Sequence, residues 1–286
     1  MNACLRRSLV SVAVLSLATT LPGCHALDFA PLTTARTTLS EEFQTGASPK
    51  IVIETFNGTI DISDGHDNEV VVEVTKTAGG FDQEKAEANL NFIEVSMVQK
   101  GETLYISARK LEDHVSNCGA SVVISAPKAA RVRAKSSNGR VICEGMQGGL
   151  EVRTSNGHIV VSEGRGAIDV GTSNGGIEID SQDAEVEART SNGRISFRGS
   201  LAPKEHVFKS SNGRIDLVLP ADAQFRYECT TSNARIKSEF DAENDDHSSR
   251  RRMRGKVGAD PRISITATTS NGGISLRKDE ALAKAE

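Results

Sequence analysis

Tryptophan is absent from this sequence, tyrosine occurs only 2 times, and aromatic residues make up 4% of the 286 residues. Surfaces that stack sugars rely on Tyr and Trp, so the composition argues against such a site. There is no basic excess, because 34 Lys and Arg stand against 38 Asp and Glu, and this argues against a general nucleic-acid binder. No internal apolar run reaches the ~20 residues of a membrane-spanning helix. Hydrophobic residues make up 37% of the chain and charged residues 25%, which is an ordinary composition for a protein with a buried core.

The residue patterns of common enzymes are also missing. The 6 His form no pair at metal-site spacing, and there is neither a Gly-x-Ser-x-Gly elbow nor a phosphate-binding loop. The acids are scattered, whereas glycoside hydrolysis needs two carboxyl groups held at a fixed separation. Asp61, Asp64, His66 and Asp67 crowd around Gly65, but they fit a polar turn better than a calcium loop. We therefore expect no enzyme activity, no cofactor and no metal.

The N-terminus has the pattern of an export signal. A basic pair precedes a mostly apolar stretch over 9–21, which has the length of a signal-peptide core. The tetrapeptide Leu-Pro-Gly-Cys that ends at Cys24 resembles the lipobox of bacterial lipoproteins, which implies cleavage before Cys24 and lipid attachment to it. An ordinary secretory signal with a chance Cys is the alternative. Residues 1–23 are then a signal peptide and 24–37 a tether, and the mature chain is anchored at the outer membrane or periplasmic face, or exposed outside the cell.

An internal repeat dominates the rest of the chain. The tripeptide Ser-Asn-Gly recurs at intervals of 18, 18, 18, 20 and 59 residues; a Ser-Asn-Ala copy divides the last interval into 21 and 38, and a Phe-Asn-Gly copy stands 81 residues before the first. These spacings are close to multiples of one period of 18–21 residues, which indicates one structural unit per copy. The asparagines of the copies are Asn57, Asn138, Asn156, Asn174, Asn192, Asn212, Asn233 and Asn271.

Alignment on the asparagine shows the local structure. Apolar residues dominate positions six and four before it and three and five after it, and polar residues mostly stand between them. This alternation predicts two strands, one on each side of a turn, with one apolar face each. The position two before the Asn is always Thr or Ser. A unit this short cannot close its own core, so neighbouring units must stack.

Two architectures fit this unit. Asn-Gly between alternating runs is a hairpin signal, which predicts an antiparallel meander. In a parallel β-solenoid, each copy is instead one coil, and like residues stack in columns at ~4.8 Å. We favour the solenoid, wound in the right-handed sense, because a meander needs no column of Ser, Asn and Gly. In it, the Asn adopts a left-handed or turn conformation and bonds along the stack, and the Gly allows positive φ.

The sequence is similar to the bacterial putative-adhesin repeat family, a domain of unknown function. The residues that carry the resemblance are 51–60, 121–127, the Thr-Ser-Asn-Gly-x-Ile copies and 261–276. The resemblance covers roughly 38–277 and implies a β-solenoid at the cell envelope. It brings no catalytic residues with it.

Two segments depart from the repeat and complete the domain map. Residues 82–91 predict a short helix with Asp82 as N-cap, and 92–98 with 103–109 a strand pair; together they cap the N-terminal end. Residues 240–261, acidic and then basic, predict a loop. The solenoid domain spans 38–277, irregular over 38–130 and regular over 131–277, and 278–286 form a tail.

Basic residues recur two positions after the asparagine. In a solenoid they line one edge beside the Asn turns, which is a candidate site for an anionic polymer such as an acidic glycan. A solvated, charge-balanced edge is the alternative, favoured by the negative net charge. The arginines concerned are Arg140, Arg194, Arg214 and Arg235.

The core columns contain two cysteines, Cys143 and Cys229, which we expect to be buried as small apolar residues. Sequential coils would place them five coils apart, about 24 Å. Because a disulfide needs Cα atoms within ~7 Å, we predict no bond between them. Cys118 follows a degenerate Ser-Asn turn, and its state stays open.

Three functions remain after these exclusions. The first is a non-enzymatic, lipid-anchored envelope solenoid that presents a repetitive surface for adhesion or scaffolding. The second is an accessory component of an envelope-stress or membrane-signalling system. The third is a glycan-active β-helix enzyme. The expected partners are the membrane, through the anchor, and an envelope polysaccharide or protein, but no nucleic acid.

Overall fold

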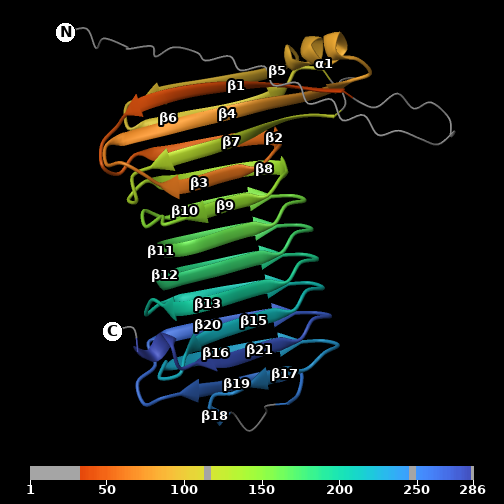
Figure 1. Ribbon diagram of the computed structural model, residues 1–286. Coiled ribbons are helices and arrows are strands. Elements are labelled where there is room, and N and C mark those ends of the chain that lie inside the picture. The colour runs from red at the N-terminus through yellow and green to blue at the C-terminus, as the bar shows by residue number, and fades with distance from the viewer. Residues whose placement is uncertain (1–32, 113–116, 245–248, 285–286) are drawn as a thin grey trace, which may run out of the picture.

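The computed structural model describes residues 33–112, 117–244 and 249–284. The expected signal peptide and the lipid-attachment residue Cys24 lie outside these ranges. The described chain is an all-β, solenoid-like stack with one short α-helix at its N-terminal end (Figure 1). Within the described residues, no helix is both long and apolar enough to cross a membrane.

Each coil consists of an entry strand, which leads into the Asn turn, and an exit strand, which leaves it (Figure 1). β11 (Ile159–Thr172) and β12 (Ile177–Thr190) each join an exit strand to the next entry strand through an irregular bend. The other entry strands are β2 (Lys50–Asn57), β6 (Thr103–Lys110), β8 (Arg131–Asn138), β10 (Leu150–Thr154), β14 (Glu205–Ser210), β16 (Phe225–Thr231) and β20 (Ile263–Thr269). The other exit strands are β3 (Ile60–Asp64), β7 (Cys118–Ala126), β9 (Val141–Glu144), β13 (Ile195–Leu201), β15 (Ile215–Pro220), β17 (Ile236–Ser238) and β21 (Ile274–Asp279).

The strands in the middle of the stack pair in parallel, with like repeat positions side by side. Val152 of β10 lies opposite Ala134 of β8 on one side and Val170 of β11 on the other. This register is the 18-residue period of the sequence, so each copy forms one coil. The parallel pairing excludes the antiparallel meander for the repeats, since a meander would reverse the direction of neighbouring strands.

At the C-terminal end, the order of coils in space differs from their order in the sequence. β20 pairs with β14 and β16, and β21 pairs with β15 and β17. The last copy, with Asn271, therefore lies between the copies with Asn212 and Asn233. The sequence analysis expected the copies to stack in chain order. The chain instead leaves a gap of one coil at β16 and fills it on its return.

The return path uses the segment that was expected to be a loop. Residues 240–261 contain β18 (Glu243–Asn244) and β19 (Arg252–Val257), and β19 pairs antiparallel with β16. The Glu228 carboxylate of β16 forms ion pairs with the guanidinium groups of Arg252, at 3.2 Å, and Arg254, at 2.5 Å. The basic segment thus pairs with β16, the outermost entry strand, and its arginines neutralise the Glu228 carboxylate. This covers a strand edge that would otherwise be open to association with another chain.

The N-terminal end has the same interleaved order. β2 lies between β6 and β8, and β3 lies between β7 and β9, so the coil of β6 and β7 stacks outside the first repeat copy. Antiparallel strands close this end: β5 (Ile93–Lys100) on β6, β4 (Glu69–Gly80) on β7, and β1 (Thr33–Gln44) on β4. β1 begins at Thr33, so its first residues fall in the stretch expected to be tether.

The helix α1 (Gln83–Leu90) matches its expected position and cap. The Asp82 carboxylate accepts a hydrogen bond from the Lys85 backbone amide at 2.7 Å. At the other end, Lys76 Nζ donates to the carbonyls of Leu90 and Ile93 at 3.2 Å, and burial lowers the pKa of this lysine. A short 3₁₀ turn, η1 (Leu282–Lys284), follows β21 in the segment expected to be a tail.

The core lies between the entry and exit strands, where the apolar columns face each other. Isoleucine and valine fill most of it with nearly zero exposure, as the repeat alignment predicts. The largest side chains gather near the C-terminal end, where the Phe197 and Phe208 rings lie 5.7 Å apart and Phe225 packs against Phe240 at 5.0 Å. Each fully buried phenylalanine contributes roughly 2–3 kcal/mol of hydrophobic stabilisation.

Candidate functional site

The eight repeat asparagines form one column along the edge of the stack. Each side-chain amide donates to the amide oxygen of the asparagine in the preceding coil, in seven hydrogen bonds of 2.6–2.7 Å. Asn57 begins the column and donates to the Cys118 carbonyl at 3.2 Å. The column follows the order in space, because Asn271 donates to Asn212 and Asn233 donates to Asn271. The result is a continuous, solvent-exposed ladder of amides.

A second column lies just inside the first. The Thr or Ser two positions before each Asn is buried, and its hydroxyl donates to the turn-glycine carbonyl of the preceding coil, or to the Ala120 carbonyl in the first copy. For Thr172 this bond to Gly157 is 3.0 Å, and the same hydroxyl accepts from the Gly175 amide at 3.2 Å. Each turn is therefore tied to itself and to its neighbour.

The turn glycines are required by closeness rather than by backbone angle. A Cβ on Gly175 would lie 1.7 Å from the Gly157 carbonyl oxygen, and one on Gly193 would lie 1.7 Å from the Gly175 oxygen. Of the turn residues, only Gly58 has positive φ, and no repeat asparagine does. Of the two Asn conformations expected, the left-handed one is therefore absent, and the positive φ expected of the turn glycine is found at Gly58 alone; in the other turns the tight stacking of coils is what excludes a side chain.

The four candidate arginines share one column, each in the turn just before an exit strand, but they do not form a continuous row. Arg194 and Arg214 occupy neighbouring coils, and both contact Asp216, at 2.7 and 3.5 Å. Arg140 is separated from them by His158 and Gly176, and Arg235 by Gly273. The structure thus brings together two of the four.

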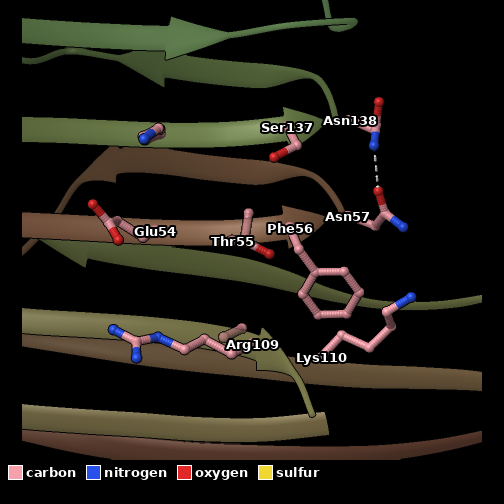
Figure 2. A pocket seen from close by; sticks show the side chains of 10 residues that line it. Glu54, Thr55, Phe56, Asn57, Arg109, Lys110, Ser137 and Asn138 are labelled. Atoms are coloured by element: carbon pink, nitrogen blue, oxygen red, sulfur yellow. Dashed lines mark hydrogen bonds between the residues drawn. The ribbon is translucent and has the colours of Figure 1, made fainter. Parts of the chain in front are cut away.

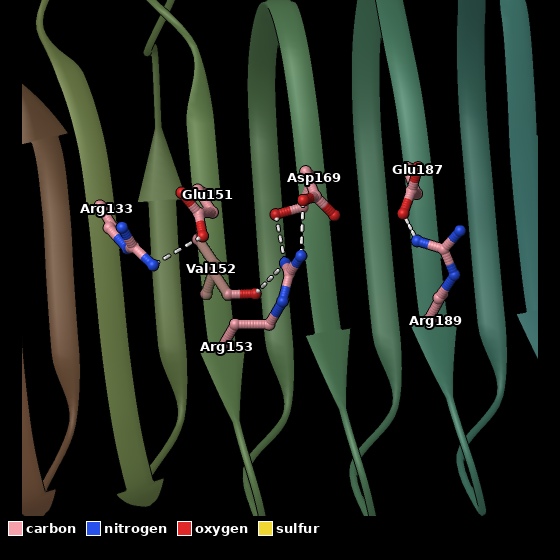
Figure 3. Close-up of polar contacts among 7 residues, drawn as sticks. All are labelled: Arg133, Glu151, Val152, Arg153, Asp169, Glu187 and Arg189. Atoms are coloured by element: carbon pink, nitrogen blue, oxygen red, sulfur yellow. Dashed lines mark hydrogen bonds and ion pairs between the residues drawn. The ribbon is translucent and has the colours of Figure 1, made fainter.

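The entry strands carry a charge-paired surface (Figure 3). Arg133 pairs with Glu151 at 3.3 Å, Arg153 pairs with Asp169 at 2.5 Å, and Glu187 pairs with Arg189 on its own strand. Acidic and basic side chains at neighbouring outward positions of the entry strands thus neutralise one another. Exposed pairs of this kind contribute little stability, typically 0–1 kcal/mol each. They keep this long face soluble and nearly neutral.

A hollow of about 570 Å³ interrupts this surface near the N-terminal end (Figure 2). Phe56 occupies the position where the other copies have Ser, and its ring lies beside Arg109 and Lys110 at the end of β6. Ser137 and Asn138 of β8 line the opposite side, and Lys135 of the same strand also lines the hollow. No role was predicted for Phe56, although its departure from the Ser column is visible in the sequence.

Burial shifts the pKa of several titratable side chains in the core. Burial raises the pKa of Cys143 and of Cys229 to about 12, so both thiols are protonated and inert near neutral pH. Both are free, and their coils are six steps apart instead of five because the Asn271 copy intervenes. Cys118 is also buried. Burial lowers the pKa of His206, whose Nδ1 accepts from the Val186 amide at 3.1 Å and whose Nε2 donates to the Ala202 carbonyl at 2.9 Å.

Clusters of metal-ligating side chains are absent from the part of the chain that the structure describes. The acids around Gly65 do not converge, and Asp64 instead forms an ion pair with Lys128 at 3.3 Å.

Comparison with known families now identifies the chain's relatives. The family model described as Toastrack DUF4097 matches residues 54–277. The chain belongs to this family. The match covers the repeats and most of the N-terminal closing strands, in agreement with the resemblance to a family of unknown function. No curated protein matches the chain.

Solved structures with low identity are also similar to this Toastrack protein. A putative adhesin from Bacteroides fragilis is 14% identical, with 84% of this chain and 97% of that chain covered and a TM-score of 0.47. A putative cell adhesion protein from Clostridium sporogenes is 9% identical, with 85% and 100% covered and a TM-score of 0.37. A putative lipid binding protein from Parabacteroides distasonis is 12% identical, with 84% and 97% covered and a TM-score of 0.40.

Proposed function

We propose that this Toastrack protein is a non-enzymatic, lipid-anchored envelope solenoid that presents a rigid, repetitive surface for adhesion or scaffolding. The observation that supports it best is the asparagine ladder with its buried hydroxyl column. Two hydrogen-bonded columns running from coil to coil hold a long edge in a fixed geometry, with regularly spaced amides exposed. We also infer that the coils wind in the right-handed sense, which is the default for parallel crossovers.

The anchor is the second part of the proposal. Lipid attachment at Cys24 leaves the eight residues 25–32 before Thr33, the first residue of β1, and the nine steps from Cys24 to Thr33 reach at most ~32 Å. The folded part would then stay close to the membrane with its N-terminal end, where β1 and α1 lie. An envelope polysaccharide or an envelope protein is the expected partner of the exposed surface.

The anchor is tested by membrane fractionation of cells that produce the full chain. The Cys24→Ala protein is expected in the soluble fraction without lipid label. The wild-type protein is expected in the membrane fraction and is expected to incorporate a lipid label. Cys4→Ala is the matched control, because it makes the same change in the leader but away from the lipobox. Retention of the Cys24→Ala protein in the membrane with lipid label would refute the anchor.

The surface role is tested with the same three strains by crosslinking in intact cells. Recovery of envelope polysaccharide or of one recurring envelope protein with the wild type, lost with Cys24→Ala and kept with Cys4→Ala, is the expected result. Recovery of neither, with the wild-type protein present at the membrane, contradicts an adhesive or scaffolding role.

A further inference from the structure

A second hollow, of about 680 Å³, lies on the exit strands near the C-terminal end. It is lined by side chains from the three neighbouring strands β15, β21 and β17 and from the turn before β13 and β15. Its polar lining consists chiefly of Arg194, Arg214, Asp216, Lys237, Ser275 and Arg277. Four cations therefore surround one small depression.

The hollow exists because the coil inserted last has small outward residues. Gly273 replaces the arginine of the neighbouring copies, and Ser275 lies next to Asp216 and Lys237 in the adjoining column. The flanking strand β17 is only three residues long. The inserted coil thus leaves a gap between Arg214 on one side and the last coil on the other.

A buried carboxylate organises the floor of this gap. The Asp216 side chain is 4% exposed and lies 2.7 Å from Arg194 and 3.5 Å from Arg214. Ser275 Oγ donates to the same carboxylate. Both arginine side chains are more than half exposed, so Asp216 holds them while much of each side chain faces solvent. A guanidinium held in this manner is prepared for an oxyanion, since Arg binds phosphate through paired N–H groups.

The rim adds positive charge without matching acids. Neither Lys237 nor Arg277 forms an ion pair with any residue that the structure describes. The acids of the hollow are Asp216 and Glu239, and Glu239 already accepts a hydrogen bond from the Lys278 backbone amide at 3.0 Å. Four cations against two carboxylates give a local excess of two positive charges in a chain whose net charge is −4.

We propose that this hollow binds a phosphate group of an anionic envelope polymer, with Arg214 and Arg277 as direct contacts and Asp216 as a positioning residue. A polymer fits better than a bilayer surface because β15 is eight strand spacings, ~38 Å, from β1, where the chain continues toward the anchor. The site rests on the proposed surface function for its role, but its binding test does not depend on the anchor.

The test is calorimetric titration of the purified mature chain with short-chain polyphosphate and with inorganic phosphate. We expect saturable binding of polyphosphate, weakened at least tenfold by Arg214→Gln and by Arg277→Gln. Arg226→Gln is the matched control, because this substitution removes the same charge from the opposite face of the stack, on the entry strand β16. Circular dichroism and the melting temperature of each variant establish that it is folded.

Three outcomes overturn the proposal. They are absence of saturable binding, equal weakening by Arg226→Gln, and unchanged affinity in both hollow variants. Vesicles of phosphatidylglycerol and phosphatidylcholine test the other source of phosphate. Equal, Arg214-dependent binding to these vesicles would assign the hollow to lipid headgroups and overturn the polymer assignment. Failure of anion binding leaves the anchored surface function standing, and loss of the anchor leaves the hollow's binding intact, so the two failures are distinguishable.

Discussion

Replacing Gly175 by alanine is expected to disrupt the stack at the Asn turns. The new Cβ would lie 1.7 Å from the Gly157 carbonyl oxygen, whereas a carbon and a carbonyl oxygen normally approach to about 3.3 Å. The two coils must therefore separate locally by roughly 1.5 Å. The obstacle is backbone on both sides, so no side-chain rotation relieves it.

The magnitude follows from what this separation breaks. The Thr172 hydroxyl bond to Gly157, now 3.0 Å, and the Asn174 amide bond to Asn156, now 2.7 Å, would both exceed hydrogen-bond range. Each such bond contributes about 1 kcal/mol, and overpacking costs typically 1–3 kcal/mol. We therefore expect Gly175→Ala to lower the free energy of unfolding by about 3–5 kcal/mol.

The measurement is urea unfolding followed by far-UV circular dichroism. Gly171→Ala is the matched control, because a Cβ there meets the flexible Arg153 side chain at 3.3 Å and the Arg189 carbonyl oxygen at 3.6 Å, which is ordinary van der Waals contact. We expect that control to lie within about 1 kcal/mol of the wild type. If Gly175→Ala unfolds at the same urea concentration as Gly171→Ala, the close-approach argument is refuted.

Three further predictions concern the ladder, the inserted coil and pH. Asn174→Ala removes two ladder bonds and Asn233→Ala removes one, so urea unfolding should show losses of about 2 and 1 kcal/mol; equal losses would contradict the ladder. Truncation after residue 261 removes the inserted coil, so limited proteolysis should cut within 221–260 instead of leaving that segment protected. Burial holds the pKa of His206 below its ordinary 6.5, so the unfolded state binds more protons and the free energy of unfolding should fall as pH drops below 6.5. The physical reason is that a protonated Nδ1 can no longer accept the hydrogen bond from the Val186 amide. If the pH dependence of stability is the same in His206→Gln as in the wild type, this role of His206 is contradicted.

The local structure of the repeats could be predicted from the sequence because each copy repeats the same physical constraints. The alternating apolar positions predict the strands, and the recurring Asn predicts a column, since only stacked coils give identical residues a reason to recur. The helix from Gln83 and its Asp82 cap follow from local propensity and one side-chain hydrogen bond. These features depend on residues near one another in the chain.

The candidate site was only partly predictable for the same reason. The column of arginines follows from the repeat period, but adjacency depends on which copies become neighbours in space. Arg194 and Arg214 meet at Asp216, which stands at a position that varies from copy to copy and gave no signal in the alignment. Phe56 was visible as an exception to the Ser column, but its place beside β6 depends on a strand 50 residues further on.

The sequence by itself determined the coil: its two strands, its turn, its inward columns and its period. Only the tertiary structure decided the order of coils at the two ends. One copy contains the same residues whichever neighbours it has, so periodicity cannot distinguish Asn233 next to Asn212 from Asn271 between them. The choice depends on closing the stack: β19 covers the outer edge of β16, and the returning chain inserts β20 and β21 into the gap. That insertion buries strand edges that sequential stacking would leave open, and it creates the hollow beside Gly273.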